Sequence, residues 1–364
     1  MSTRMKPASP SPRRIRAALA RRSKPAAALA FIGTILFGAG CTKKAEQGGT
    51  APTSAPPPGA TAPASGAAVP AAGATYRFAF LTNNSTDFWN IAQKGTQKAE
   101  KDFGVKVDTF RPLKGEVADQ QRYLEDIMVQ KYDGVAVSPV NPDALTGIFD
   151  RVAEKMPLVT HDSDAPKSKR KVYVGTNNVE AGKIAGNTAI AALKEAGVKG
   201  GKIAIFVGRM DMQNAIERKK GLDETLGKLA GFEILPPYLD HTDRAKAKKN
   251  VEDALARYPD LVMAIGLWSY NGPCIAGAVR ESSRAKKPIL VTFDEEPETL
   301  KGVQDGLIYA TIVQQPFQFG YQSIRVLKEL KDGKTLPQTV ETPILTVNKG
   351  NVDKFWSELR ELKK

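Results

Sequence analysis

The residues best suited to chemistry are polar side chains that come directly after short apolar segments. Asp162 and Asp294 each follow such a segment, and Arg218 lies in the polar stretch after another. Carboxylates accept hydrogen bonds from hydroxyls, whereas guanidinium and amide N–H groups donate to hydroxyl oxygens. These groups together suit a small ligand with many hydroxyls. Three further polar residues in comparable positions belong to the same candidate site: Ser138, Asn271 and Gln314.

Two aspartates facing a ligand also suggest an enzyme, because paired carboxylates are the acid and the nucleophile of many glycoside-processing enzymes. In such enzymes apolar surroundings raise the pKa of the acid. Asp162 and Asp294 have hydrogen-bonding neighbours along the chain, and we expect neither pKa to be raised. The sequence therefore favours binding without catalysis, and an anchored glycoside-processing enzyme is the alternative from a different class.

Two adjacent aromatic residues, Phe88 and Trp89, begin the first amphipathic helix. They follow an apolar strand at residues 77–81 and a polar turn in which Thr86 or Asp87 is a natural N-cap. One interpretation places both rings in the core. The other places them at the rim of the site, where flat apolar faces pack on the C–H surfaces of a ligand. The polar residues after the other strands favour the second interpretation.

From residue 76 onward the chain repeats a short apolar strand, a polar turn and an amphipathic helix. This alternation predicts an α/β fold with parallel sheets and helices on both faces. About 290 residues with ten such strands exceed one compact layer, so we expect two lobes. In such sheets ligands bind beyond the carboxyl ends of the strands, where the candidate residues lie. The expected strands cover residues 77–81, 105–110, 134–138, 158–160, 172–175, 202–207, 233–235, 262–267, 289–293 and 308–313.

The sequence offers no motif for a phosphate cofactor or a metal. Neither Gly175-Thr-Asn-Asn nor Val207-Gly-Arg-Met has the glycine spacing of a dinucleotide loop or a P-loop. The two histidines, His161 and His241, lie far apart in the chain and lack the spacing of zinc ligands. We therefore expect no cofactor and no metal.

The first 41 residues have the composition of an export signal. Residues 1–44 carry ten Lys or Arg and no acidic residue, and an apolar run from Ala26 to Gly40 precedes Cys41. This run is shorter than the ~20 residues that span a bilayer, so a cleaved signal peptide is favoured over a permanent membrane helix. The Gly38-Ala-Gly-Cys41 segment is similar to the lipobox of bacterial lipoproteins, which makes Cys41 a candidate for lipidation.

Residues 42–75 are rich in Ala, Pro, Gly, Ser and Thr, and we expect a disordered tether there. The basic leader also accounts for most of the net charge of +14. Residues 45–364 hold 43 basic and 39 acidic residues, so the expected domain has little electrostatic attraction for nucleic acid.

Several short segments, in this order and spacing, resemble the periplasmic sugar-binding proteins of ABC importers, in particular the ribose/allose/galactose-type group. The resemblance covers about residues 76–345. The segments are Asp87-Phe-Trp, Tyr132-Asp-Gly-Val-Ala-Val-Ser-Pro, Val159-Thr-His-Asp162, Val174-Gly-Thr-Asn-Asn-Val-Glu-Ala-Gly-Lys-Ile-Ala-Gly, Glu217-Arg218-Lys-Lys-Gly-Leu, Val291-Thr-Phe-Asp294 and Ala310-Thr-Ile-Val-Gln314-Gln-Pro.

The resemblance implies a type I periplasmic binding fold, in which two similar Rossmann-like lobes are joined by three crossovers and close on a ligand. The first lobe would comprise residues 76–176 and 316–342, and the second residues 177–315 and 343–364. Such a cleft is fully bonded to the ligand only when shut, so ligand binding shifts the population toward the closed form.

The resemblance also assigns roles to the candidate residues. Phe88 and Trp89 would sandwich a sugar ring, and the hydroxyls and ring oxygen would be bound by Asp162, Arg218, Asn271, Asp294 and Gln314. Thr86 stands where ribose binders have asparagine, Ser138 where they have an amide, and Ser163 where they have arginine. These departures point to a pentose, hexose or polyol other than ribose.

We therefore expect a monomeric, lipid-anchored binding protein of the periplasm that delivers a sugar or polyol to an ABC permease in the inner membrane. A sensor that partners a chemoreceptor or a histidine kinase belongs to the same binding class and stays open. A sugar-responsive transcription regulator would need a helix-turn-helix before the domain, where the sequence has a signal and a tether instead.

Overall fold

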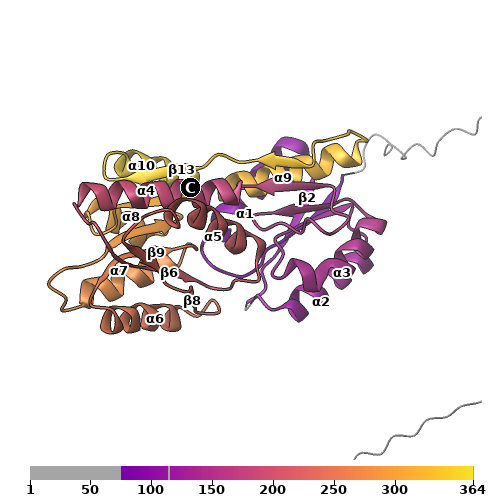
Figure 1. The fold of residues 1–364 in the computed structure, drawn as a ribbon. Coiled ribbons are helices and arrows are strands. Elements are labelled where there is room, and N and C mark those ends of the chain that lie inside the picture. Colours follow the sequence, from indigo (N-terminus) through magenta and orange to yellow (C-terminus); the bar gives the residue numbers. More distant parts are fainter. Residues whose placement is uncertain (1–74, 114, 364) are drawn as a thin grey trace, which may run out of the picture. The chain divides into compact units, whose positions relative to one another are not determined.

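The computed structural model describes residues 75–113 and 115–363, and these form two sheets with helices on both faces (Figure 1). The first sheet, called sheet A, has all six strands parallel, in the order β12-β5-β4-β3-β1-β2. Its strands are β1 (Arg77–Leu81), β2 (Lys106–Phe110), β3 (Gly134–Val137), β4 (Leu158–His161), β5 (Val172–Gly175) and β12 (Thr339–Glu341).

The second sheet, sheet B, has the order β13-β11-β10-β9-β6-β7, and a short strand β8 also pairs with β6. All its pairs are parallel except β11 with β13. Its strands are β6 (Gly201–Val207), β7 (Phe232–Ile234), β8 (Tyr238–Leu239), β9 (Leu261–Gly266), β10 (Ile289–Phe293), β11 (Ala310–Val313) and β13 (Leu345–Asn348).

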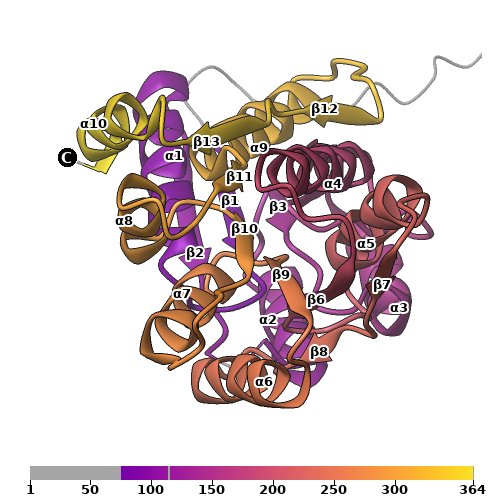
Figure 2. The same ribbon diagram turned by 60° about the vertical axis from the view of Figure 1, so that its left-hand side comes forward.

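The helices cover both faces of each sheet, and Figure 2 shows α4 on one side of sheet B with α7 and α8 on the other. Helices α1 and α9 pack on one face of sheet A, and α2 and α3 on the opposite face. The helices are α1 (Phe88–Phe103), α2 (Val117–Val129), α3 (Pro142–Lys155), α4 (Asn178–Glu195), α5 (Gln213–Leu226), α6 (Arg244–Arg257), α7 (Asn271–Glu281), α8 (Pro297–Gln304), α9 (Pro316–Lys331) and α10 (Val352–Lys363).

The strands are apolar on both faces because each sheet is covered on both sides. In β1, Phe78 and Phe80 pack under α9, while Ala79 and Leu81 pack against α2 and α3. Strand β6 shows the same alternation, with Ile203, Ile205 and Val207 toward α4 and α5. Side chains of a strand alternate between faces with a period of two, so a continuous apolar run fills two cores at once.

Two pairs of helices approach so closely that only glycine fits between them. In the α1–α9 pair, a Cβ on Gly320 would lie 2.0 Å from the carbonyl oxygen of Ala92. In the α4–α5 pair, a Cβ on Gly182 would lie 2.2 Å from the carbonyl oxygen of Arg218. The second contact fixes the helix that carries Arg218.

The chain passes between the sheets three times. It leaves sheet A after β5 and enters α4, returns from β11 to α9, and crosses again between β12 and β13. The strands of the two sheets follow the same order and differ only in the direction of one edge strand, β12 or β13. Two lobes of the same design are therefore joined by three connections.

All ten expected strands are present, with ends that differ by two residues or fewer. Strands β8, β12 and β13 were not expected. They are two to four residues long, and the exposed positions in all three weaken the apolar signal that marks a strand. The expected signal peptide, Cys41 and the tether lie outside the described residues.

The close contact of α1 with α9 gives a test of the fold. We expect Gly320→Ala to lower the free energy of unfolding by about 1–3 kcal/mol, because its methyl group overlaps backbone atoms that cannot move aside. Gly147→Ala in α3 is the matched control, since no atom lies within 4 Å of its added Cβ, and it should be neutral or raise stability by about 0.5–1 kcal/mol. Urea unfolding of both variants measures the difference, and equal effects would contradict the packing described.

Candidate functional site

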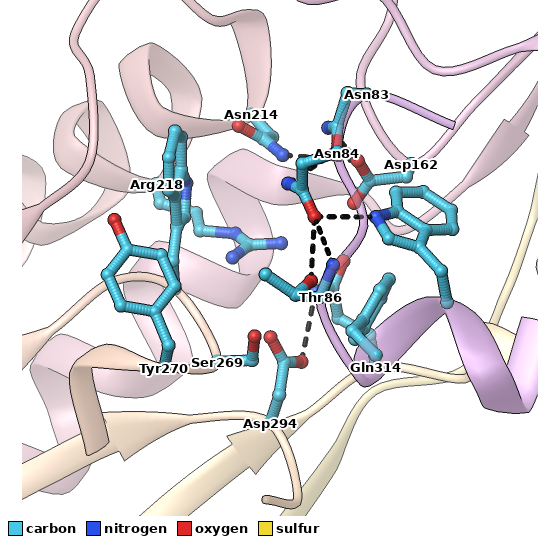
Figure 3. A pocket seen from close by; sticks show the side chains of 13 residues that line it. Asn83, Asn84, Thr86, Asp162, Asn214, Arg218, Ser269, Tyr270, Asp294 and Gln314 are labelled. Atoms are coloured by element: carbon cyan, nitrogen blue, oxygen red, sulfur yellow. Dashed lines mark hydrogen bonds between the residues drawn. The ribbon is translucent and has the colours of Figure 1, made fainter. Parts of the chain in front are cut away.

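Residues from the carboxyl ends of both sheets line one pocket, which encloses about 380 Å³ of empty space, part of it open to solvent. Figure 3 shows Arg218 between Tyr270 and Asp162, with Asp294 and Gln314 close by. The lining residues are Asn83, Asn84, Thr86, Phe88, Trp89, Asp162, Asn214, Arg218, Trp268, Ser269, Tyr270, Asp294 and Gln314. A pocket of this size is in the range of small-molecule sites.

Asp162 and Asp294 occupy equivalent places in the two sheets. Each is the first residue after the third strand in the shared strand order, β4 in sheet A and β10 in sheet B. Both have a positive φ, +58° and +64°. Side chains other than glycine adopt this conformation rarely and at a cost, and it persists where the surrounding structure enforces it, often at functional sites. The backbone turns sharply at both positions and points both carboxylates into the pocket.

Hydrogen bonds from both lobes hold one oxygen of the Asp162 carboxylate. Its Oδ2 accepts from Ser138 Oγ at 2.8 Å, from Asn83 Nδ2 at 3.2 Å and from Asn214 Nδ2 at 3.5 Å. Its Oδ1 has no hydrogen-bond partner within residues 75–113 and 115–363. Asp162 therefore offers one acceptor oxygen to the pocket.

The other charged groups come from sheet B and its helices. Asp294 Oδ1 accepts from Gln314 Nε2 at 3.0 Å. Arg218, on α5, is almost fully buried, and it donates through Nε to Asn178 Oδ1 at 3.0 Å and through Nη1 to the carbonyl oxygen of Leu267 at 2.6 Å. Its guanidinium also lies over the ring of Phe293, 4.5 Å from the ring centre. These contacts fix the direction of its remaining Nη2 group.

Burial raises the pKa of both aspartates, and the expectation of unraised pKa values was wrong. The pKa of Asp294 rises to about 6, because desolvation outweighs the attraction of Arg218 and the bond from Gln314. Burial also raises the pKa of Asp162 against the opposing effects of Arg218 and the donors Ser138, Asn214 and Asn83. Hydrogen-bonding neighbours in the sequence gave no measure of how deeply these carboxylates are desolvated.

Four buried polar atoms of lining residues have no hydrogen-bond partner within the described part of the chain. Two are donors, Arg218 Nη2 and Trp268 Nε1, and two are acceptors, Asn214 Oδ1 and Gln314 Oε1. Exchanging the amide oxygen and nitrogen of Asn214 or Gln314 would lose a hydrogen bond, because each amide directs its N–H group at a carboxylate. Buried polar groups are almost always paired in folded proteins, so four unpaired groups around one pocket indicate a ligand that donates and accepts.

Phe88 and Trp89 both line the pocket and are also packed in the core. Their rings meet edge to face, with centres 5.1 Å apart and planes at 89°, so no ligand ring fits between them.

The turn before α1 is stabilised differently from the expectation. Asp87 is at the N-cap position but makes no side-chain cap bond. Asn84 holds the turn instead, since its Oδ1 accepts from the backbone N–H of Thr86 at 2.9 Å and from Trp89 Nε1 at 3.2 Å. The asparagine three residues before the N-cap position thus also fixes the tryptophan ring.

Ser138 and Asn271 lie outside the pocket lining, and each is bonded to a lining residue. Ser138 is fully buried behind Asp162. Asn271 begins α7, where its Oδ1 accepts from the backbone N–H of Trp268 at 3.0 Å. Direct contact of these two residues with a ligand stays a prediction.

A comparison with known proteins places the chain in a family. Residues 78–335 match the family described as periplasmic binding protein domain. The chain belongs to this family. Its type I fold with two parallel-sheet lobes is confirmed, and so is the choice of a binding protein over an enzyme, because the family consists of binding proteins.

Several relatives match this chain over most of their own length. The D-allose-binding periplasmic protein of Escherichia coli is 28% identical over 262 residues, 70% of this chain and 84% of that protein. The ribose import binding protein of Salmonella typhimurium is 28% identical over 253 residues, 68% and 81% of the two chains. A solute-binding protein of Burkholderia graminis, solved in complex with D-arabinose, matches with a TM-score of 0.72 and 28% identity, over 76% of this chain and 96% of that one.

In this periplasmic binding protein side chains of the two lobes bond to each other directly. Asn141 Nδ2, on the sheet A side, donates to Asp211 Oδ2 at 3.0 Å. Asp211 also pairs with Arg209, whose Nη1 donates to the carbonyl oxygen of Gly115 at 3.5 Å. With the bond from Asn214 to Asp162, these contacts from both sides describe a closed cleft.

Sequence reasoning missed several lining residues. Asn83, Asn84, Asn214, Ser269 and Tyr270 line the pocket but were not chosen. They lie in turns or in the first turn of a helix after a strand, so the rule that chose Asp162 also covers them. The type of residue alone does not tell which members of a polar turn point inward.

Two features are absent from residues 75–113 and 115–363. No group of three or more His, Cys, Asp or Glu side chains is arranged to hold a metal ion. In the same residues, no helix combines the length and the apolar character needed to cross a membrane.

The raised pKa of Asp294 predicts a pH dependence of stability. Its folded-state pKa of about 6 exceeds the ordinary value of 3.8, so folding takes up a proton between these values. The stabilisation is present below about pH 4 and is lost as the pH rises through about 6, on the order of 3 kcal/mol in all. Asp294→Asn should therefore gain stability relative to the ligand-free wild type across this window, as measured by urea unfolding from pH 4 to 7.

Asp211→Asn provides the flat control, because Arg209 lowers the pKa of Asp211 below its ordinary value of 3.8. The stabilisation by this carboxylate is lost only below that value, so the stability of Asp211→Asn relative to wild type should stay nearly constant from pH 4 to 7. A difference between Asp294→Asn and wild type that stays constant from pH 4 to 7 would contradict the desolvated carboxylate.

Proposed function

We propose that this protein captures an uncharged monosaccharide or polyol and delivers it to an ABC permease of the inner membrane. The observation that carries the proposal is the set of four unpaired buried atoms around the pocket, two donors and two acceptors. A hydroxyl group both donates and accepts. A ligand with several hydroxyls on one small ring or chain can therefore satisfy all four groups together with Asp162 Oδ1.

The relatives support a sugar as the ligand class. Their printed names describe binding of D-allose and import of ribose, and the solved neighbour from Burkholderia graminis holds D-arabinose. These sugars differ in size and stereochemistry, so they support the class of ligand and not one member of it.

The charges of the pocket argue against an anionic ligand. Two buried carboxylates, Asp162 and Asp294, line it beside one guanidinium, that of Arg218. A sugar phosphate or a uronic acid would bring a further negative charge into a desolvated site that already holds more negative than positive charge. Neutral hydroxyls instead donate to the carboxylates at no such cost.

Closure of the cleft is the proposed mechanism of capture. Asp162, Phe88 and Trp89 come from the first lobe, Arg218 and Asp294 from the second, and Gln314 from a connection between them. A ligand that bonds to both sets is bound fully only in the closed form, so it shifts the population toward closure. The permease would then recognise the closed surface. A receptor or a histidine kinase as the reader of this surface is the alternative of the same class.

We also propose the domain plan given by the sequence, with lobe boundaries at 176/177, 315/316 and 342/343. Export by residues 1–41, lipidation of Cys41, a tether over residues 42–75 and a monomeric state complete the proposal. The tether length supports it, because some thirty residues of flexible chain reach roughly 30 Å from an anchored end. That span lets the binding domain reach a permease in the same membrane.

A thermal-shift screen followed by calorimetry tests the function. The panel holds pentoses, hexoses and polyols, each beside its phosphate or uronic acid where one exists. A ligand at a thousandfold excess over its Kd stabilises the native form by about 4 kcal/mol, which raises the Tm clearly. We expect one or a few neutral stereoisomers to bind and their anionic counterparts to fail. Absence of any shift with neutral sugars and polyols would refute the assignment.

Arg218→Ala tests the site within the same assay. We expect the bound sugar to lose roughly 2–4 kcal/mol of binding free energy, because removal leaves two buried carboxylates without their cation. Lys219→Ala is the matched control on the next residue of α5, where the side chain pairs with Asp223 at the surface. A loss below tenfold for Arg218→Ala would place the guanidinium outside the site.

Cys41→Ser tests the anchor. Acyl chains on Cys41 would hold the wild-type protein in the membrane fraction through salt washes. The serine variant should appear in the soluble periplasmic fraction with its sugar affinity unchanged. Equal partition of the two proteins between these fractions would exclude lipidation at this residue.

A further inference from the structure

The second-lobe wall of the pocket is a short turn and not a regular element. Residues Trp268, Ser269 and Tyr270 all line the pocket, between the end of β9 at Gly266 and the start of α7 at Asn271. A turn has no ladder of backbone bonds to fix its side chains, so the positions of its two aromatic rings depend on specific contacts from behind.

Asp240 supplies these contacts although it does not line the pocket. Its side chain is fully buried and accepts from the hydroxyl of Tyr270 and, at 3.1 Å, from Asn271 Nδ2. Asn271 in turn accepts from the backbone N–H of Trp268 at 3.0 Å. Both ends of the aromatic turn are therefore bonded, directly or through one residue, to a single carboxylate.

The backbone around Asp240 is itself held in an unusual conformation. His241 and Thr242, the two residues that follow, have φ values of +57° and +66°. The N–H of Thr242 donates to Asp240 Oδ1 at 2.9 Å, and the N–H of Asp240 donates to the carbonyl oxygen of Val207 at 3.2 Å. Two consecutive left-handed residues persist only where surrounding bonds enforce them. The carboxylate is thus tied to strand β6 and to its own turn, as a fixed base for the aromatic wall.

The glycine that contacts the Trp268 ring provides an independent observation. Gly208, which follows β6, lies beneath Trp268 and Tyr270. A Cβ at this position would be 1.9 Å from Trp268 Cζ3 and 2.6 Å from the hydroxyl oxygen of Tyr270. The N–H of His241 donates to the carbonyl oxygen of Gly208 at 2.9 Å. The absent side chain of Gly208 and the bonds of Asp240 therefore place the same two rings.

We propose that Asp240 is a positioning residue for the sugar site, which fixes the Trp268–Tyr270 wall and thereby sets affinity without touching the ligand. This inference rests on the proposed sugar-binding function. The physical reason is preorganisation: a wall that is already fixed loses no conformational freedom when the ligand binds. Without the carboxylate, Tyr270 and Asn271 lose their shared acceptor, and binding has to order the turn anew.

Calorimetry on the full-length protein with the tightest sugar of the screen tests the proposal. We expect Asp240→Asn to raise Kd by at least about tenfold, because the new amide directs an N–H group at the N–H group of Asn271. The double variant Asp240→Asn with Asn271→Asp exchanges donor and acceptor and restores the bond. Its Kd should fall at least about threefold below that of Asp240→Asn alone, a rescue expected only if the two positions act through this bond.

Asp164→Asn is the control for a general loss of stability. Asp164 is a partly buried aspartate that pairs with Arg170 at 2.7 Å and does not line the pocket. Its replacement should lower the Tm and leave Kd within twofold of wild type. The proposal would be overturned if Asp240→Asn is folded and its Kd stays within twofold of wild type. It would also be overturned if the double variant does not lower Kd relative to Asp240→Asn.

Gly208→Ala keeps the test decisive if Asp240→Asn does not fold. The added methyl group would overlap the rings of Trp268 and Tyr270 and displace them, so this variant should also raise Kd by at least about tenfold. Gly277→Ala in α7 is its control, since no atom lies within 4 Å of the added Cβ. A folded Gly208→Ala with unchanged Kd overturns the inference, whereas a wild-type protein that binds no sugar overturns the proposed function and the inference with it.

Discussion

The site depends on the burial of two carboxylates around one guanidinium. Asp162 belongs to one lobe, and Asp294 and Arg218 belong to the other, so the full arrangement exists only when the lobes meet. Burying a charge is costly unless it is paired and hydrogen-bonded. The surrounding amides and hydroxyls offset part of this cost, and the raised pKa values record the part that remains. A ligand that donates to the carboxylates and accepts from Arg218 removes that remainder, which makes the closed cleft most favourable when it is filled.

The backbone places these charges by using one design twice. Each carboxylate follows the equivalent strand of its sheet, β4 or β10, in a left-handed conformation, and each lobe has a helix pair that closes over glycine. The parallel strands end at one edge, so residues distant in sequence meet there without any long loop. The differences between the lobes lie in the turns. The first lobe carries the asparagine turn that fixes Trp89, and the second carries the aromatic turn based on Asp240. Shared strands therefore set the position of the pocket, and unshared turns set its chemistry.

The fold was predictable because continuous apolar runs and polar turns alternate over almost 290 residues, and this pattern survives any uncertainty about single positions. Six of the eight chosen binding residues line the pocket for the same reason, since strand ends can be read from the sequence. Ser138 and Asn271 do not line the pocket but are hydrogen-bonded to residues that do. The direction of a side chain within a turn depends on tertiary contacts, and these leave no periodic signal in the sequence. The same limit explains why the sequence did not predict a role for Asp240. Nothing in Leu239-Asp-His-Thr242 indicates that the aspartate is buried, and only the packed Trp268–Asn271 turn gives it a role.

The two lobes contribute to recognition in different ways. On the first lobe most polar groups already satisfy one another: Asn83 and Ser138 bond to Asp162, and Asn84 bonds to Trp89, which leaves Asp162 Oδ1 open. On the second lobe and at its connection the groups are unpaired, namely Arg218 Nη2, Asn214 Oδ1, Trp268 Nε1 and Gln314 Oε1. A surface whose groups are mutually bonded changes little when a ligand arrives, whereas unpaired groups lose free energy for every partner that the ligand fails to supply. The penalty for a misplaced hydroxyl therefore falls on the second lobe and takes effect at closure.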